Sequence, residues 1–528
     1  MRRKPLVLVA LLLAAFLVNL DTTLVNVALP ALTRELHATT TQLQWVVDAY
    51  NLVFAALILT FGSLSDRFGR KGMLLAGLAV VGTASLAGGF TNTPAELIAA
   101  RAAMGLGAAM AFPATLSLLT NVFTERRELA RAIGLWGAVA GVAIAMGPIV
   151  GGWLLQEFSW GSIFVAMAPV AAVAAACVAF AVPASKSPDT ARLDLPGLLL
   201  SSATMALLVF TIIEAPAYGW TAARSLAGFA VAAALLAAFI AVERRAAHPM
   251  LDVRLFRNMR FSAASAAVTV SFFTLFGFIF LIAQYFQFVR GYSPLSTGVR
   301  LLPVAASVAA GSIAGTQLAV RAGTKLVVTT GLVAVAAFYG WVAATTSTTL
   351  SYGTIAAQMV VYGLGLGLTS APATESIMGA ISRAKAGVGS AVNDSTRLIG
   401  GTLGVAVIGS VYASVYGSHL TAATPAALPG QVAAIAHQSI GAAYGAAGKI
   451  AALGHPALGN ALHLAATNAF LRGLTIGALV AGGVAALGAL LVALFLPAQP
   501  PSQTAGEAGT TDGAREPETQ TRPAPAAH

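Results

Sequence analysis

Long apolar runs follow one another along most of the chain, and short polar segments separate them. A helix needs about 20 apolar residues to cross the hydrocarbon core of a bilayer. The pattern therefore predicts an all-α polytopic membrane protein with fourteen transmembrane helices. The predicted spans are 6–30, 43–62, 73–91, 96–119, 130–155, 162–182, 195–214, 225–242, 260–286, 298–320, 325–345, 351–375, 393–416 and 469–496.

The basic residues gather in alternate loops. If the N-terminus is cytoplasmic, most of the 30 Lys and Arg residues fall in loops on the cytoplasmic side. Cytoplasmic loops are enriched in these residues. We therefore expect a multi-pass protein of the bacterial inner membrane with both termini in the cytoplasm. The net charge of +11 is explained by this topology, so we expect no binding to nucleic acid.

Three short segments in the first half of the chain recur, in the same order, in the second half. Repeated segments in a membrane protein typically enclose a central site near the bilayer midplane. The repeat predicts two six-helix pseudo-symmetric bundles with two inserted helices between them. The matching pairs are 62–71 with 316–325, 113–117 with 372–376, and 131–134 with 397–400. The predicted domains are 1–182, 183–259, 260–496 and a disordered cytoplasmic tail at 497–528.

Composition agrees with a chain that faces lipid. Hydrophobic residues make up 57% and charged residues 9%, whereas soluble domains carry about 25% charged residues. One long segment, 417–468, is rich in Ala and Gly and is predicted to be a solvated or interfacial outer loop. Its four histidines match no metal-binding spacing, so a metal site there is the less favoured interpretation. They are His419, His437, His455 and His463.

Three ionisable residues fall inside predicted spans, where charge is costly and usually functional. Asp21, Asp48 and Arg101 lie at similar depths in the outer half of spans 1, 2 and 4. Burial disfavours a charged carboxylate, whereas a neighbouring arginine favours it. An Asp–Arg pair that forms and breaks therefore suits proton coupling and substrate binding. The alternatives are that Asp21 is a static partner of Arg101 and that Asp48 is an interfacial residue in contact with water.

A glycine-rich charged loop lies between the second and third spans. Its glycines permit a tight turn, and its carboxylate can pair with a basic residue one turn away. We interpret it as a gating latch, and the alternative is a solvated turn. The loop residues are Gly62, Asp66, Arg67, Gly69, Arg70 and Lys71.

The fifth span carries Gly147, Pro148, Gly151 and Gly152. Proline removes a helical hydrogen bond, and small residues let helices approach closely, so a kinkable and tightly packed helix is expected. Further candidates for the lining of a central cavity are Asn26, Tyr285, Gln287 and Glu375. Glu375 is equally well explained as a surface residue near the cytoplasmic end of its span.

Several of these stretches resemble the fourteen-helix drug:proton antiporter family of the major facilitator superfamily. The loop 62–71 resembles the superfamily's signature loop, and 20–30, 45–50 and 147–152 resemble family patterns of the first, second and fifth helices. The segment 101–107 is similar to the fourth-helix pattern, although Met104 stands where glutamine is usual, and Trp160 is followed by Gly161 where arginine is usual. The resemblance implies an antiporter that uses a rocking movement of its two halves.

Taken together, these observations predict a proton-coupled multidrug efflux antiporter for small amphipathic compounds, with a preference for cations. Its expected partners are membrane lipid, protons and these substrates, and we expect a monomer without cofactor or metal. A dedicated exporter of a metabolite, antibiotic, lipid or siderophore remains an alternative. A membrane-embedded enzyme is a weaker alternative, because the sequence has no nucleotide-binding loop, metal-ligand spacing or nucleophile elbow.

Overall fold

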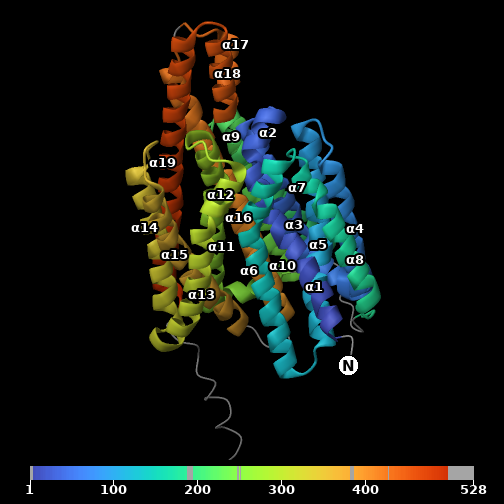
Figure 1. Cartoon of the computed structure of the whole chain (residues 1–528). Coiled ribbons are helices and arrows are strands. Elements are labelled where there is room, and N and C mark those ends of the chain that lie inside the picture. The colour runs from blue at the N-terminus through green and yellow to red at the C-terminus, as the bar shows by residue number, and fades with distance from the viewer. Residues whose placement is uncertain are drawn as a thin grey trace, which may run out of the picture.

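Every regular element that the structure describes is a helix. The computed structural model describes residues 4–186, 194–246, 249, 251–380, 386–425 and 427–497. Within them, fourteen helices are long and apolar enough to cross a membrane, which confirms the predicted number of spans. The predicted tail lies outside the described residues except for Pro497. Figure 1 shows the long helices side by side, with the N-terminus at the lower end.

The N-terminal bundle holds six of the spans and begins with a broken helix. A 3₁₀ turn interrupts the first span, so that its last part, α2, forms a separate short helix at the upper end (Figure 1). The elements of this bundle are α1 (Lys4–Leu24), η1 (Val25–Ala28), α2 (Leu29–Glu35), α3 (Thr40–Phe68), α4 (Arg70–Gly88), α5 (Pro94–Val122), α6 (Arg126–Glu157), α7 (Ser162–Val165) and α8 (Met167–Ala181).

Two inserted helices precede the C-terminal bundle, and they are α9 (Leu195–Tyr218) and α10 (Ala223–Arg245). The helix α9 packs against both α3 and α16, so it contacts one helix from each bundle. The elements of the C-terminal bundle are η2 (Val253–Arg257), α11 (Met259–Gln284), a π-helical turn η3 (Tyr285–Val289), α12 (Pro294–Arg300), α13 (Leu302–Ala322), α14 (Thr324–Thr345), α15 (Tyr352–Gly379), α16 (Ala386–Ala423), α17 (Gly430–Gln438), α18 (Ile440–Ala452) and α19 (Pro456–Phe495).

The two bundles repeat one another in their packing. The helix α3 packs on α5 and α6 packs on α1, just as α13 packs on α15 and α16 packs on α11. The junctions α3–α4 and α13–α14 both turn at a glycine with positive φ, which is +119° at Gly69 and +86° at Gly323. A side chain is strained in that backbone region, so glycine is needed at both turns. Pro113 and Pro372 lie inside the matching helices α5 and α15. The predicted pseudo-symmetry is therefore confirmed.

The prediction of a loop at 417–468 is wrong, because most of that segment is helical. The helices α16 and α19 are 38 and 40 residues long. At 1.5 Å per residue they measure roughly 57 and 60 Å, about twice the thickness of a hydrocarbon core. Their excess length rises above the other helices and carries α17 and α18 (Figure 1). We call residues 417–468 the cap, and the end of the molecule that carries it the cap end.

The cap contains buried apolar residues that continue the core of the membrane region. Ile440, Ala443 and Leu462 are fully buried, and α18 packs along α19. The segment is helical because alanine has the highest helix propensity and packs closely, although its residues are too weakly apolar to read as a membrane span. Among the described residues, no group of three or more His, Cys, Asp or Glu side chains is arranged to hold a metal ion.

The two bundles meet at the cap end. In the part of the chain that the structure describes, hydrogen bonds join the bundles there. Among them, Gln44 Nε2 donates to Ala406 O at 3.1 Å, Gln287 Nε2 to Val27 O at 2.8 Å, and Thr40 Oγ1 to Gln438 O of the cap at 3.1 Å. The two bundles are thus held together on the side that carries the cap.

Candidate functional site

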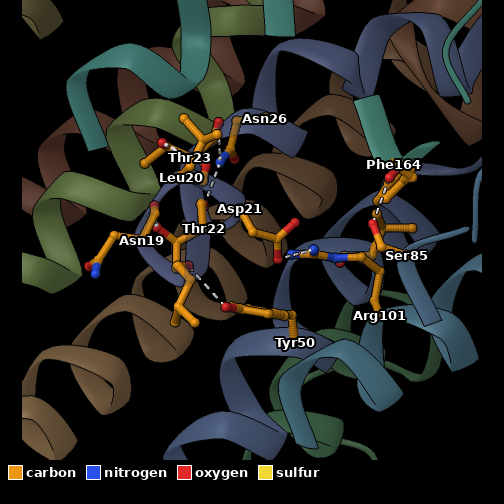
Figure 2. Close-up of polar contacts among 12 residues, drawn as sticks. Asn19, Leu20, Asp21, Thr22, Thr23, Asn26, Tyr50, Ser85, Arg101 and Phe164 are labelled. Carbon is orange, nitrogen blue, oxygen red and sulfur yellow. Dashed lines mark hydrogen bonds and ion pairs between the residues drawn. The ribbon is translucent and has the colours of Figure 1, made fainter. Parts of the chain in front are cut away.

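A buried ion pair joins the first and fifth helices. Asp21 on α1 and Arg101 on α5 are 1% and 0% exposed, and Asp21 Oδ2 lies 2.6 Å from Arg101 Nη1. Figure 2 shows the two side chains pointing toward one another. The pair forms because α1 and α5 are packed together and the two residues lie at similar depths, as their positions within the apolar spans predict. Each side chain keeps one polar atom, Asp21 Oδ1 and Arg101 Nη2, without a hydrogen-bond partner among the described residues.

The guanidinium of Arg101 is held in place from three sides. Its Nε donates to Val46 O of α3 at 3.0 Å, and its Cζ lies 4.5 Å from the ring centroid of Tyr50. The hydroxyl of Tyr50 donates in turn to Val18 O of α1 at 3.1 Å (Figure 2). Gly105 on α5 leaves room for this arrangement, because a Cβ there would collide with the carbonyl of Tyr50. The pair therefore ties α1, α3 and α5 together at one depth.

Asp48, the third charged candidate, is buried but separate from this ion pair. It is 0% exposed, and neither carboxylate oxygen has a hydrogen-bond partner among the described residues. The alternative that Asp48 is a water-contacting interfacial residue is not supported by this burial. A buried carboxylate without a partner is costly, by several kcal/mol if charged. Among the described residues, Asp48 thus lacks the compensation that Arg101 gives to Asp21.

The glycines of the fifth span lie where α6 meets other backbones. A Cβ at Gly147 would collide with Thr23 Oγ1 of α1, and one at Gly151 would lie 3.0 Å from Leu24 O. A Cβ at Gly152 would lie 2.5 Å from Pro294 O of α12, in the other bundle. Pro148 is buried and lies against Gly298 of α12. These residues therefore pack α6 against α1 and also against the C-terminal bundle.

The charged loop between α3 and α4 is tied to the end of α8. Asp66 Oδ1 lies 2.7 Å from Arg70 Nε, and Arg70 donates from its backbone N–H to Ser185 O at 3.0 Å. Lys71 Nζ donates to Ala179 O at 2.7 Å. Arg67, by contrast, is exposed and lies over the ring of Phe68. The predicted Asp66–Arg70 pair is present, and its contacts lie within the N-terminal bundle and the start of the following linker.

We expect Asp66→Asn to reduce transport strongly while leaving the protein folded. The carboxylate of Asp66 is 42% exposed, and ion pairs of that kind contribute about 0–1 kcal/mol to stability. A large loss of transport would therefore reflect the conformational cycle and not unfolding. Efflux by cells that contain equal amounts of each protein measures the effect. Wild-type efflux by the Asp66→Asn variant would reduce the loop to a topology signal.

The four cavity candidates do not form one cluster. Gln287 contacts the 3₁₀ turn that contains Asn26, whose Oδ1 has no hydrogen-bond partner among the described residues. Tyr285 lines an apolar pocket inside the C-terminal bundle and donates to Ser347 O at 2.8 Å. Glu375 is exposed near the end of α15 opposite the cap, in agreement with its interpretation as a surface residue. Asn26 and Gln287 thus remain the candidates at the contact between the bundles.

Sequence reasoning missed a second group of charges in the C-terminal bundle. Asp394 and Arg397 lie one turn apart on α16, in the apolar span Ala391–Ala423. Arg397 Nη2 donates to Thr374 Oγ1 of α15 at 3.3 Å, and its Cζ lies 5.3 Å from the ring centroid of Phe272. The signal was the position of both residues inside the first turns of an apolar span. Arg397 lies close to a predicted cytoplasmic loop, where basic residues are common, so its charge alone does not single it out.

Two pseudo-symmetric helical bundles with charged side chains buried between their helices define the class of secondary transporters. The chain belongs to the Major Facilitator Superfamily, whose family model matches residues 11–405. It is 35% identical over 413 residues to the multidrug resistance protein Stp of Mycobacterium tuberculosis, covering 78% of this chain and 76% of Stp. It is also 35% identical over 436 residues to the multidrug efflux pump LfrA of Mycolicibacterium smegmatis, covering 83% of this chain and 86% of LfrA.

A solved structure has the same fold. The bacterial homologue of the human lysosomal transporter Spinster, in an inward-facing and unoccupied conformation, matches with a TM-score of 0.64. The alignment covers 94% of this chain and 99% of that chain at 17% sequence identity. At this identity the likeness concerns the fold alone, and it agrees with the helix order described above.

Proposed function

We propose that this protein is a proton-coupled multidrug efflux antiporter that exports small amphipathic compounds by alternating access. The relatives Stp and LfrA are named for multidrug resistance and multidrug efflux, and each matches most of this chain. In this proposal the chain carries out transport and no enzymatic reaction. It acts as a monomer in the bacterial inner membrane, with both termini in the cytoplasm and the cap outside.

The observation that carries the proposal is the burial of two carboxylates in different surroundings. Asp21 is compensated by Arg101, whereas Asp48 has no partner among the described residues. A buried carboxylate takes up a proton when it loses its cationic partner and releases that proton when the partner returns. A pair of acidic groups with unequal compensation is therefore suited to coupling proton entry with substrate exit.

The contacts between the bundles support alternating access. They lie at the cap end, which the distribution of basic residues assigns to the outside. The conformation described here is thus closed to the outside, and transport requires these contacts to open in another state. The repeated packing of the two bundles lets them rock about the central seam as rigid bodies.

The proton-motive force is large enough for this work. Moving one charge through 100 mV supplies about 2.3 kcal/mol, and one pH unit supplies about 1.4 kcal/mol. Two carboxylates, Asp21 and Asp48, are buried in the N-terminal bundle, together with one arginine, Arg101. This excess of acidic groups favours cationic or weakly basic substrates.

The test uses inverted membrane vesicles from cells with and without the protein. We expect uphill uptake of amphipathic cationic dyes into vesicles that contain it, and collapse of that uptake when nigericin abolishes the pH gradient. Release of protons from the vesicle lumen on dye addition is the second readout. Dye uptake that persists without any proton gradient would contradict proton coupling. A panel of dyes of which only one is moved would favour the dedicated exporter.

A further inference from the structure

One face of α3 carries three buried polar side chains. Gln44, Asp48 and Asn51 are 0%, 0% and 1% exposed. Their spacing of four and three residues places them on one face of the helix, one above another. Such a polar stripe inside a membrane span is costly and calls for a partner that satisfies it.

The stripe faces the seam between the bundles. Gln44 Nε2 donates to Ala406 O at 3.1 Å and to Ser410 Oγ at 3.2 Å, both on α16. Leu52, four residues beyond Asp48, belongs to an apolar cluster with Ala406 and with three residues of α9. Asp48 lies between these two positions on the same row of α3. It is therefore directed toward α16 of the C-terminal bundle, with α9 covering the seam.

The stripe has more acceptors than donors left unpaired. Among the described residues, both oxygens of Asp48, the Oδ1 of Asn51 and the Oε1 of Gln44 lack a hydrogen-bond partner. The Nδ2 of Asn51 is the one unpaired donor of these three side chains. A buried polar group without a partner destabilises the fold, because it loses its hydrogen bonds to water and gains none. Unpaired acceptor oxygens on neighbouring residues indicate that the stripe binds a ligand rich in N–H donors.

We propose that Asp48 and Asn51 form a subsite for a protonated amine that carries at least one N–H donor. The amine donates to a carboxylate oxygen of Asp48 and to Oδ1 of Asn51, and its charge is balanced by Asp48. Hydrogen bonds to a charged group are about twice as strong as neutral ones. This inference rests on the proposed export function and names a substrate class for it.

The inserted helix gives the subsite its low-dielectric surroundings. The wall that α9 contributes consists of Val209, Ile212 and Ile213, which are buried against Leu52 and Ala406. An apolar wall strengthens the attraction between a bound ammonium and Asp48, because opposite charges interact more strongly where water is excluded. The inserted helix α9 thus acquires a function in substrate selection. A quaternary ammonium has the same charge but no N–H, so Asn51 contributes nothing to its binding.

The test measures binding of two dyes to the purified full-length protein in lipid nanodiscs. One dye is a dansyl-linked primary ammonium, and the other is its trimethylammonium analogue with the same charge. We expect Asn51→Leu to weaken binding of the primary ammonium at least tenfold, which corresponds to about 1.4 kcal/mol, because one hydrogen bond to a charged group is lost. Binding of the trimethylammonium dye stays unchanged. Asn51→Gln keeps an amide acceptor oxygen without adding a charge, and it retains binding of the primary ammonium.

Two controls separate this subsite from a structural role. Replacement of an unpaired buried amide by an apolar group is close to neutral for stability, so Asn51→Leu keeps the melting temperature of the unliganded protein. Ser85→Ala removes a buried hydroxyl that donates to Phe164 O within the N-terminal bundle, and leaves binding of both dyes unchanged. Equal weakening of both dyes, or of neither, by Asn51→Leu overturns the subsite. Competition by sodium ions with the primary ammonium, but not with its analogue, also overturns the subsite, because sodium carries no N–H donor. Wild-type protein that binds and exports neither dye counts instead against the proposed function.

Discussion

Replacement of Asp21 by asparagine is expected to abolish uphill efflux driven by a pH gradient. Asparagine keeps the shape of the side chain but takes up no proton. In the structure, Asp21 is the acidic partner of Arg101, and both side chains are buried. Protonation of Asp21 and its pairing with Arg101 compete, and this competition is what couples proton movement to a conformational change. The measurement is dye uptake into inverted vesicles at a fixed pH gradient.

A single substitution at Asp21 also leaves Arg101 as an uncompensated buried charge. Breaking a buried ion pair in this way costs about 3–5 kcal/mol, so loss of activity by Asp21→Asn alone would be ambiguous. The double variant Asp21→Asn with Arg101→Gln removes both charges and avoids that cost. We expect it to fold, to bind dye and to equilibrate dye down its gradient, yet to show no uphill transport. If the double variant pumps dye uphill at the wild-type rate, Asp21 is a static partner of Arg101 and the coupling residue is Asp48.

The helices of the membrane region were predictable because the bilayer leaves the chain few choices. Backbone groups within lipid must be hydrogen-bonded inside the segment, so an apolar run of sufficient length becomes a helix. The similar depths of Asp21 and Arg101 along their helices then followed from counting residues, and this agreement in depth is a condition for the ion pair that the structure shows. That α1 and α5 lie side by side is a matter of packing, which the structure supplies.

The cap and the stripe of α3 were not predictable in the same way. The cap lies beyond the apolar run of the last two spans, where helix formation depends on alanine propensity and on packing, as at Ala443 and Leu462. The surroundings of Asp48 depend on how α9 and α16 pack against α3, and these segments are far apart in the sequence. Counting residues along one helix gives the depth of a side chain but not the neighbour that it faces.

Covalent closure of the cap onto the N-terminal bundle is expected to stop transport. Gly441 of α18 lies against α2, since a Cβ built at Gly441 would be 2.5 Å from Thr33 Cγ2. Thr40 Oγ1 also donates to Gln438 O of the cap. The cap belongs to the C-terminal bundle through α16 and α19, so these contacts bridge the two bundles at the end that we assign to the outside. Opening to the outside must break them.

The experiment introduces Thr33→Cys with Gly441→Cys into a chain whose single cysteine, Cys177, is replaced by serine. Their side chains are close enough for a disulfide, which needs Cβ atoms about 3.5–4.5 Å apart. Oxidation is expected to abolish dye efflux, and reduction to restore it, because the disulfide holds the transporter closed to the outside.

The matched control is Ala451→Cys with Gly459→Cys, a pair within the cap whose Cβ positions lie 3.1 Å apart. That cross-link joins two parts of one rigid body and leaves efflux unchanged. Full efflux by protein that is completely cross-linked between residues 33 and 441 would mean that the cap moves with the N-terminal bundle, and that the outer opening lies elsewhere.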